Sequence, residues 1–217
     1  YPRLFRVFSG TVPPAGRPTP SPLRWVMNQR KAAMIRRATP ADAEALSTLS
    51  RTCFTQTFGH LYAPADLAAF LDEAYAPTVL RAELEDPHRA TWLLFEDPSD
   101  EAPASSATQA PIGYVTACPA HLPHPDVALG DGEIQRLYIL QGHQGGGRGT
   151  ALLTTALEWL ERDGPRTLWI GVWSENYGAQ RFYARHGFEI VGDYSFMVGD
   201  HADYELITRR PARLPSE

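Results

Sequence analysis

The chain has 217 residues, with 20 Lys and Arg against 25 Asp and Glu, so its formal net charge is −5. This length suffices for one hydrophobic core, or for one domain with an extension. No run approaches the roughly 18 apolar residues of a membrane span, and the acidic balance argues against nucleic acid as a main partner. The two cysteines, Cys53 and Cys118, make no disulfide framework. We therefore expect a cytoplasmic protein with neither a nucleic-acid nor a membrane partner.

The charge is divided unevenly along the chain. Residues 1–37 contain eight bases and no acid, so the remainder carries 12 bases and 25 acids. Such an acidic body is compatible with a cationic substrate, and it would equally serve solubility alone.

The first 32 residues form a basic extension with the proline-rich run VPPAGRPTPSP, which predicts an extended or disordered segment. Two interpretations of it stay open. Its composition is typical of an organelle transit peptide, whereas Met27 and Met34 favour a later translation start, with the upstream residues foreign to the native protein. We expect one domain over 33–210 and a tail over 211–217.

Regular patterns begin at Met34 and continue to the last strand. Thr39, as N-cap, and Pro40 open the first helix. The Ala- and Ser-rich segment after Asp97 predicts a long loop between two strands. Helices are expected at about 40–59, 64–75, 78–86, 151–161 and 176–187, and strands at about 34–39, 90–97, 112–120, 133–140, 167–173, 188–198 and 203–209. This alternation predicts a single α/β or α+β domain with a mixed sheet.

A strand, a glycine-rich turn and a helix follow one another over residues 133–161, as EIQRLYIL, QGHQGGGRGT and ALLTTALEWLE. Glycines let the backbone approach a ligand, and the unpaired N–H groups of a helix start favour an anion. Arg148 and Gly149 replace the Lys and Ser/Thr of a Walker A loop, and Leu152 replaces the last glycine of a dinucleotide fingerprint. The pattern that remains is Q-x-x-G-x-G, and a glycine-rich connector without a ligand is the alternative.

This pattern, followed by LWIGVWSEN and AQRFYARHGFEIVG, resembles the GNAT N-acetyltransferases over residues 34–209. The wording of the last segments is most similar to the bacterial spermidine/spermine N-acetyltransferases. The resemblance implies a mostly antiparallel twisted sheet whose central strands splay apart, flanked by four to five helices. It also implies acetyl-CoA as donor and a primary amine as acceptor.

The resemblance assigns the cofactor contacts by position. The backbone of the central strand would hold the pantetheine arm, the glycine loop would wrap the pyrophosphate, and Asn176 would touch the arm. The implied contacts are Leu137, Tyr138, Ile139, Gln144, Gly145, Gly146, Gly147, Arg148, Gly149, Thr150, Asn176 and Tyr183.

Acetyl transfer from a thioester needs a polarised carbonyl, a neutral amine and a proton for the leaving thiolate. The N–H of Ile139 or a close neighbour is the expected carbonyl donor. Tyr183 is the expected general acid, because a phenol with an ordinary pKa of about 10 keeps its proton at neutral pH. Some family members carry a Glu where this chain has Gly171. Glu133, acting through water, is therefore the candidate base, unless solvent removes the proton.

The acceptor side is expected from the first helices, with His60, Tyr62, Asp66 and Glu73 as weak candidates against a merely solvated helix face. Cys118 is expected to be a core residue rather than a nucleophile. His121 and His124 lack a third ligand at a helpful spacing, so no metal is expected.

The sequence thus predicts an acetyl-CoA-dependent N-acetyltransferase that acts by direct transfer in a ternary complex on a small-molecule amine. A polyamine is the favoured acceptor. The alternatives are an enzyme for protein N-terminal, lysine or other small amines, and a CoA-binding module without catalysis. A homodimer would fit the resemblance, although no apolar stripe requires it.

Overall fold

The computed structural model describes residues 34–96 and 109–212. The N-terminal extension over 1–32, most of the long loop after Asp97 and the tail from residue 213 lie outside the described residues. Across the described ranges, no helix combines the length and the apolar character needed to cross a membrane.

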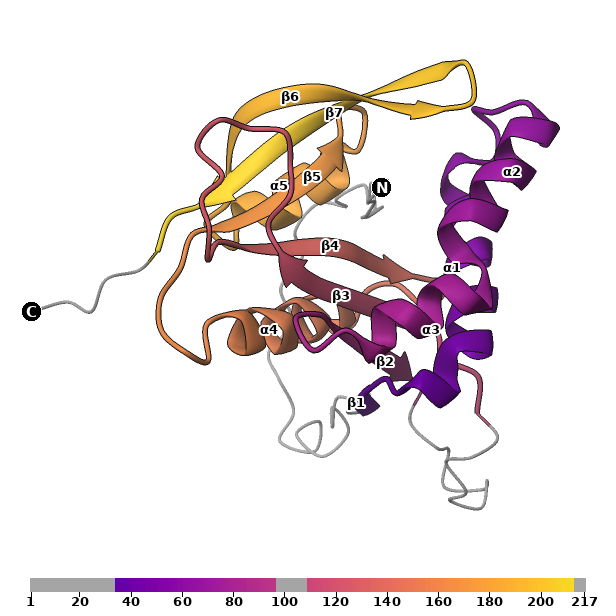
Figure 1. Ribbon diagram of the computed structural model, residues 1–217, viewed down its shortest axis with the longest axis horizontal. Coiled ribbons are helices and arrows are strands. Elements are labelled where there is room, and N and C mark those ends of the chain that lie inside the picture. The colour runs from indigo at the N-terminus through magenta and orange to yellow at the C-terminus, as the bar shows by residue number, and fades with distance from the viewer. Residues whose placement is uncertain (1–33, 97–108, 213–217) are drawn as a thin grey trace, which may run out of the picture.

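Seven described strands form one sheet in the order β1-β2-β3-β4-β5-β7-β6 (Figure 1). Only the β4–β5 pair is parallel, and the other described pairs are antiparallel. The mixed, mostly antiparallel sheet confirms the predicted fold class. The strands are β1 Met34–Arg37, β2 Ala90–Phe95, β3 Gly113–Pro119, β4 Gly132–Ile139, β5 Leu168–Trp173, β6 Glu189–Val198 and β7 His201–Arg210.

Two groups of helices cover the two faces of the sheet. Alternation along β2 shows the division, because Leu94 packs with α4 and α5 in one core cluster while Leu93 packs with α1, α2 and α3 in another. The described α-helices are α1 Ala43–Phe58, α2 Pro64–Tyr75, α3 Pro77–Glu85, α4 Arg148–Leu160 and α5 Tyr177–Ala184.

The first helix starts as predicted at Thr39, with one difference. A 3₁₀ turn, Pro40–Asp42, precedes the α-helical part. The Asp42 carboxylate accepts the N–H and the hydroxyl of Thr39 at 2.8 and 2.9 Å, and it pairs with Arg36 at 2.6 Å. The hydrogen bond from Arg36 is the main cause that lowers the pKa of Asp42 to about 2. This junction fixes the end of β1 against the start of α1.

The two central strands splay apart, as expected. β4 pairs with β5 only at Gly132 with Leu168 and at Glu133 with Trp169, whereas β4 pairs with β3 from Gly132 to Ile139. Beyond Glu133, the two strands diverge toward their carboxyl ends. The glycine loop after β4 and the start of α5 after β5 both lie at this open end (Figure 1).

Candidate active site

The open edge of β4 presents backbone groups toward the gap. The N–H of Leu140 donates to the carbonyl oxygen of Ile112 at 2.9 Å, on the β3 side. Backbone groups alternate along a strand, so the N–H groups of Ile139 and Leu137 point to the β5 side. At the other end of β4, the N–H of Gly132 also points to that side, where it meets Thr167 O at 3.0 Å. Even-numbered residues face β5 at this end and odd-numbered residues face it at the other. The alternation is offset by one residue because β3 and β4 shift register between Thr116 and Ala117.

The glycine loop has a backbone that requires glycine. Gly145, Gly146 and Gly147 have φ of +90°, +61° and +82°, and an added Cβ there would meet no heavy atom within 4 Å among the residues described. The loop is therefore open on its outer side, and its left-handed residues explain the run of glycines. Arg148 begins α4 directly after Gly147.

The first turn of α4 points unpaired N–H groups into this open space. Those of Gly149 and Thr150 are among the first four of the helix, which have no intrahelical acceptor. The Arg148 guanidinium braces the loop through His143 O at 2.9 Å, and Gln144 Nε2 donates to Ile139 O at 3.2 Å. The arrangement is suited to an anion such as a pyrophosphate.

Asn176 closes the gap from the β5 side. Its Oδ1 caps α5 by accepting the Ala179 N–H at 3.0 Å. The Nδ2 of the same side chain is buried, and no described residue accepts a hydrogen bond from it. Because a buried donor without a partner is costly, this Nδ2 favours a ligand acceptor in the gap.

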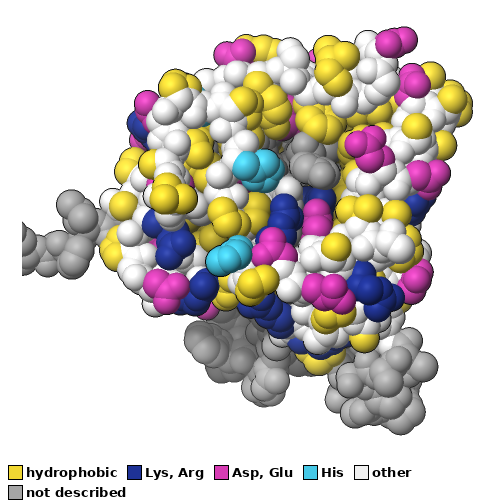
Figure 2. Space-filling model, viewed as in Figure 1, with side chains coloured by type: hydrophobic (Ala, Val, Ile, Leu, Met, Phe, Trp, Pro, Cys, Tyr) yellow, Lys and Arg dark blue, Asp and Glu magenta, His cyan; other side chains and the backbone are white. Residues whose placement is uncertain are grey.

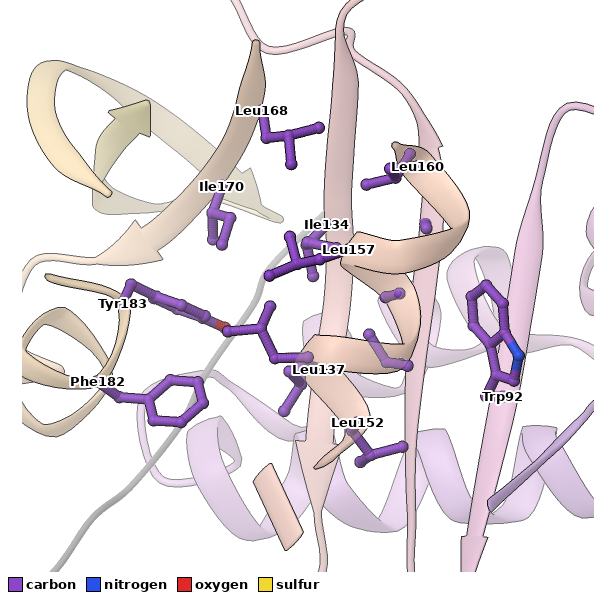
Figure 3. Packing of buried hydrophobic residues seen from close by; sticks show 14 of the residues in the cluster. Trp92, Ile134, Leu137, Leu152, Leu157, Leu160, Leu168, Ile170, Phe182 and Tyr183 are labelled. Atoms are coloured by element: carbon purple, nitrogen blue, oxygen red, sulfur yellow. The ribbon is translucent and has the colours of Figure 1, made fainter. Parts of the chain in front are cut away.

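Tyr183 lies further along the same helix, near the carboxyl end of α5. Its side chain is buried, with only 1 % exposed, and packs near Phe182 and Phe188. Figure 3 shows its ring pointing from α5 toward α4 and Leu137 of β4, with the hydroxyl leading. The phenol is thus directed toward the open strand edge that holds the backbone N–H groups.

Glu133 lies at the opposite, paired end of β4. The carboxylate is fully buried, and its Oε2 accepts the backbone N–H of His121 at 2.9 Å. Nδ1 of His121 lies 3.2 Å from the same oxygen. Cys118, the cross-strand partner of Glu133, carries a buried thiol that is in no disulfide. Its Sγ lies 3.9 Å from His121 Nδ1. His124 Nε2 instead lies 3.3 Å from Val191 O, so the two loop histidines contact different residues.

The acceptor candidates from the first helices lie in different environments. His60 and Glu73 are exposed. Asp66 lies against Gly199, in the turn between β6 and β7. Tyr62 is buried, and its hydroxyl donates to the carboxylate of Asp203 on β7. Burial, followed by this carboxylate, raises the pKa of Tyr62, so the phenol stays protonated at neutral pH.

Two acids on β7 were missed by the sequence interpretation. Asp203 and Glu205 are buried at alternate positions of the strand, and Tyr194 donates to Glu205 Oε2 at 3.1 Å. Glu205 is the cross-strand partner of Trp173, the last residue of β5. Its carboxylate is therefore near the open end of the gap. The sequence did contain a signal for them, because the D-x-E pattern puts two acids on one face of a strand that continues with apolar residues.

Glu205 and Trp173 lie on the face of the sheet that bears α1, α2 and α3. Trp173 packs against Phe58 of α1 at 5.7 Å between ring centroids, and its partner Glu205 points to the same face. Figure 2 shows this face hollowed between the helices and the strands, with acidic and basic side chains in the hollow. The gap between β4 and β5 thus has a glycine loop at its open end and buried carboxylates on one face.

Comparisons with known proteins agree with this geometry. A sequence model of the acetyltransferase (GNAT) family matches residues 44–188. Uncharacterized N-acetyltransferases of Mycobacterium tuberculosis and Mycobacterium bovis are 31 % identical over 173 residues, which cover 78 % of this chain and 97 % of each relative. A relative from Lactobacillus delbrueckii subsp. lactis, also an uncharacterized N-acetyltransferase, is 26 % identical over 169 residues, covering 78 % of this chain and 91 % of the relative.

Solved structures share the fold at low identity. The PaiA N-acetyltransferase from Thermoplasma acidophilum, solved in complex with coenzyme A, has a TM-score of 0.62 at 18 % identity, covering 83 % of this chain and 99 % of that one. The ribosomal-protein-S18-alanine N-acetyltransferase from Escherichia coli has a TM-score of 0.58 at 15 % identity, covering 86 % and 97 %.

Proposed function

The chain belongs to the acetyltransferase (GNAT) family, and we propose that it transfers the acetyl group of acetyl-CoA to a primary amine by direct attack within a ternary complex. A polyamine is the preferred acceptor class. The observation that carries the proposal is the gap between β4 and β5, with the glycine loop and Asn176 at its open end.

The residues around the gap fit acetyl-CoA, which would supply a thioester-bound acetyl group. The backbone edge at Leu137 and Ile139 would hold the pantetheine arm as a neighbouring strand does. The buried Nδ2 of Asn176 would find its acceptor on that arm. The open glycine loop and the start of α4 would hold the pyrophosphate.

The chain's own groups can perform both halves of the chemistry. The N–H of Leu137 or Ile139 polarises the acetyl carbonyl, and a single donor of this kind contributes about 3 kcal/mol to catalysis. Tyr183 holds a proton at its hydroxyl for the departing thiolate. Its position on α5, directed toward β4, supports this role (Figure 3).

The acceptor amine would enter from the face that bears α1 to α3. Tyr62, Asp203 and Glu205 lie there, and two buried carboxylates complement a chain with several ammonium groups. Glu133 remains the candidate base, acting through water, and the N–H of His121 holds its carboxylate in place. His60, Asp66 and Glu73, nearer the rim, would contact only a longer acceptor.

A thiol-release assay across acceptor classes tests the proposal. Spermidine, spermine, free amino acids, an aminoglycoside and a lysine-containing peptide would be compared at equal concentration. We expect the polyamines to give the highest kcat/KM. Activity confined to the peptide or to amino acids would refute the acceptor assignment, and acetyl-CoA binding without turnover on any amine would indicate a non-catalytic module.

A further inference from the structure

Cys118, His121 and Glu133 bring three metal-binding atoms together. Nδ1 of His121 is 3.2 Å from Oε2 of Glu133 and 3.9 Å from Sγ of Cys118. All three ligand atoms lie within 4.8 Å of one another. Zinc binds N, O and S ligands at about 2.0–2.3 Å, so tetrahedral neighbours are separated by about 3.3–3.6 Å. The three atoms are therefore close to the spacing of a zinc site.

The sheet builds this cluster from two strands and a turn. Cys118 and Glu133 are cross-strand partners of β3 and β4, on the face opposite α4, because their neighbours Ala117 and Ile134 pack into the α4 cluster. His121 follows the end of β3 and folds back over the pair. Two ligands are thus rigid, and the half-exposed His121 can adjust.

The chemistry of the three groups is selective. We propose that Cys118, His121 and Glu133 bind one zinc ion, with water as a fourth ligand. A thiolate, an imidazole and a carboxylate together favour zinc over magnesium or calcium, which take oxygen ligands. Binding releases the thiol proton of Cys118 to solvent. The backbone N–H of His121, 2.9 Å from Glu133 Oε2, would orient the carboxylate from outside the ligand set.

Occupation of this site has a consequence for catalysis, which rests on the proposed function. Glu133 is the candidate base, and a carboxylate bound to zinc cannot accept a proton from the acceptor amine. Zinc should therefore inhibit acetyl transfer reversibly. Binding of the metal itself does not depend on that role.

The test begins with metal binding by the full, reduced chain. Titration with Co²⁺ should give one equivalent with a thiolate-to-cobalt charge-transfer band, which one equivalent of Zn²⁺ displaces. Cys118→Ser should abolish the band and weaken Zn²⁺ binding at least ten-fold. Cys53→Ser and His124→Ala are matched controls that should retain both. Equal Zn²⁺ affinity in Cys118→Ser and wild type would overturn the proposal.

His121→Ala gives a second variant, on the half-exposed ligand, in case Cys118→Ser does not fold. It should also lose at least ten-fold in Zn²⁺ affinity, and unchanged affinity would again refute the site. Acetyl transfer is then measured with and without stoichiometric Zn²⁺. We expect inhibition of the wild type, relieved by EDTA, and resistance in the variants. Because the cobalt spectrum requires no turnover, loss of the proposed acetyltransferase activity would leave the metal result intact.

Discussion

The two sides of the gap between β4 and β5 are assembled in different ways. On the cofactor side, the strand edge, the glycine loop and the start of α4 form one continuous stretch from Leu137 to Thr150. On the acceptor side, Tyr62 meets Asp203 across 141 positions of the chain. A nearly contiguous motif would hold acetyl-CoA, whereas elements distant in the chain would form the proposed acceptor side. The local motif can therefore be recognised in the sequence, whereas the proposed acceptor side becomes visible only in the folded chain.

Removing the hydroxyl of Tyr183 should have the largest effect, and it should lower the rate of acetyl transfer without weakening acetyl-CoA binding. For Tyr183→Phe, we expect turnover to fall by about 100-fold or more, as for the loss of a general acid. Acetyl-CoA affinity should stay within about two-fold because the ring packing survives. Thiol release and calorimetry measure the two quantities. Tyr177→Phe, on the exposed side of the same helix, is the control. Turnover equal to wild type would exclude Tyr183 from the mechanism.

Gly147→Glu should break the cofactor side without touching the acceptor side. The new residue would have to adopt φ of +82°, at a cost of about 1–2 kcal/mol, and would bring a carboxylate to the expected phosphate site. We expect calorimetry to show coenzyme A affinity reduced by about 100-fold, since like charges repel at short range. Gly147→Ala carries the strain without the charge and should lose less. Normal affinity in a folded Gly147→Glu would place the pyrophosphate elsewhere.

Glu205→Gln should do the reverse and affect only the acceptor side. Loss of a buried charge that pairs with an ammonium costs about 1.5–3 kcal/mol, so the KM for spermidine should rise at least ten-fold. Acetyl-CoA affinity should not change. Glu189→Gln, exposed at the start of β6, is the matched control. If steady-state kinetics gave an unchanged KM, the amine would have to bind away from β7.

Asn176→Asp separates two roles of one side chain. It keeps an oxygen for the Ala179 N–H and removes the Nδ2 donor. Thermal unfolding should stay close to wild type, while coenzyme A affinity should fall several-fold, by about 1 kcal/mol for one lost hydrogen bond. Asn176→Ala should lose both the affinity and about 1 kcal/mol of capping energy. An Asn176→Asp variant that binds coenzyme A normally would make this residue a helix cap only.

The smallest effect is expected at Asp42, which supports the helices of the acceptor side. The pKa of Asp42 is about 2 in the folded chain, below the ordinary unfolded value near 3.9. The carboxylate therefore contributes its full stabilisation of the fold above about pH 4. This stability is lost as the pH falls from about 4 toward 2. Asp42→Asn should lower the free energy of unfolding by about 1 kcal/mol at pH 7, after allowance for solvent screening.

Urea unfolding at pH 7 and pH 3 checks the sign at Asp42, since the difference from wild type should shrink at the lower pH. Glu44→Gln, exposed in the same first turn, is the control. A difference that grew on acidification would contradict the assignment, and a change in acetyl-CoA affinity would show that the two sides are coupled.

The elements were predictable from sequence because their signals are local. Thr39 and Pro40 predicted the start of the first helix. Apolar residues at helical spacing predicted the later helices, and alternation of apolar and polar residues predicted the strands. One difference was the start of α4, which begins at Arg148 rather than at residue 151. Another was the 3₁₀ turn before α1, where the Asp42 carboxylate, paired with Arg36, accepts the Thr39 N–H. Short-range hydrogen bonds of this kind blur a boundary but do not change an element.

The candidate site also has local features, which the sequence predicts, and side-chain clusters, which depend on the tertiary structure. The sequence by itself determined the glycine loop, since left-handed φ at Gly145 to Gly147 excludes most other residues, and it placed Asn176 at a helix start. Only the tertiary structure decided that Asp203 meets Tyr62, that Tyr194 donates to Glu205, and that Glu133 meets Cys118 and His121. The reason is physical, because backbone conformation depends on near neighbours, whereas a cluster of side chains depends on which strands pair and in which register.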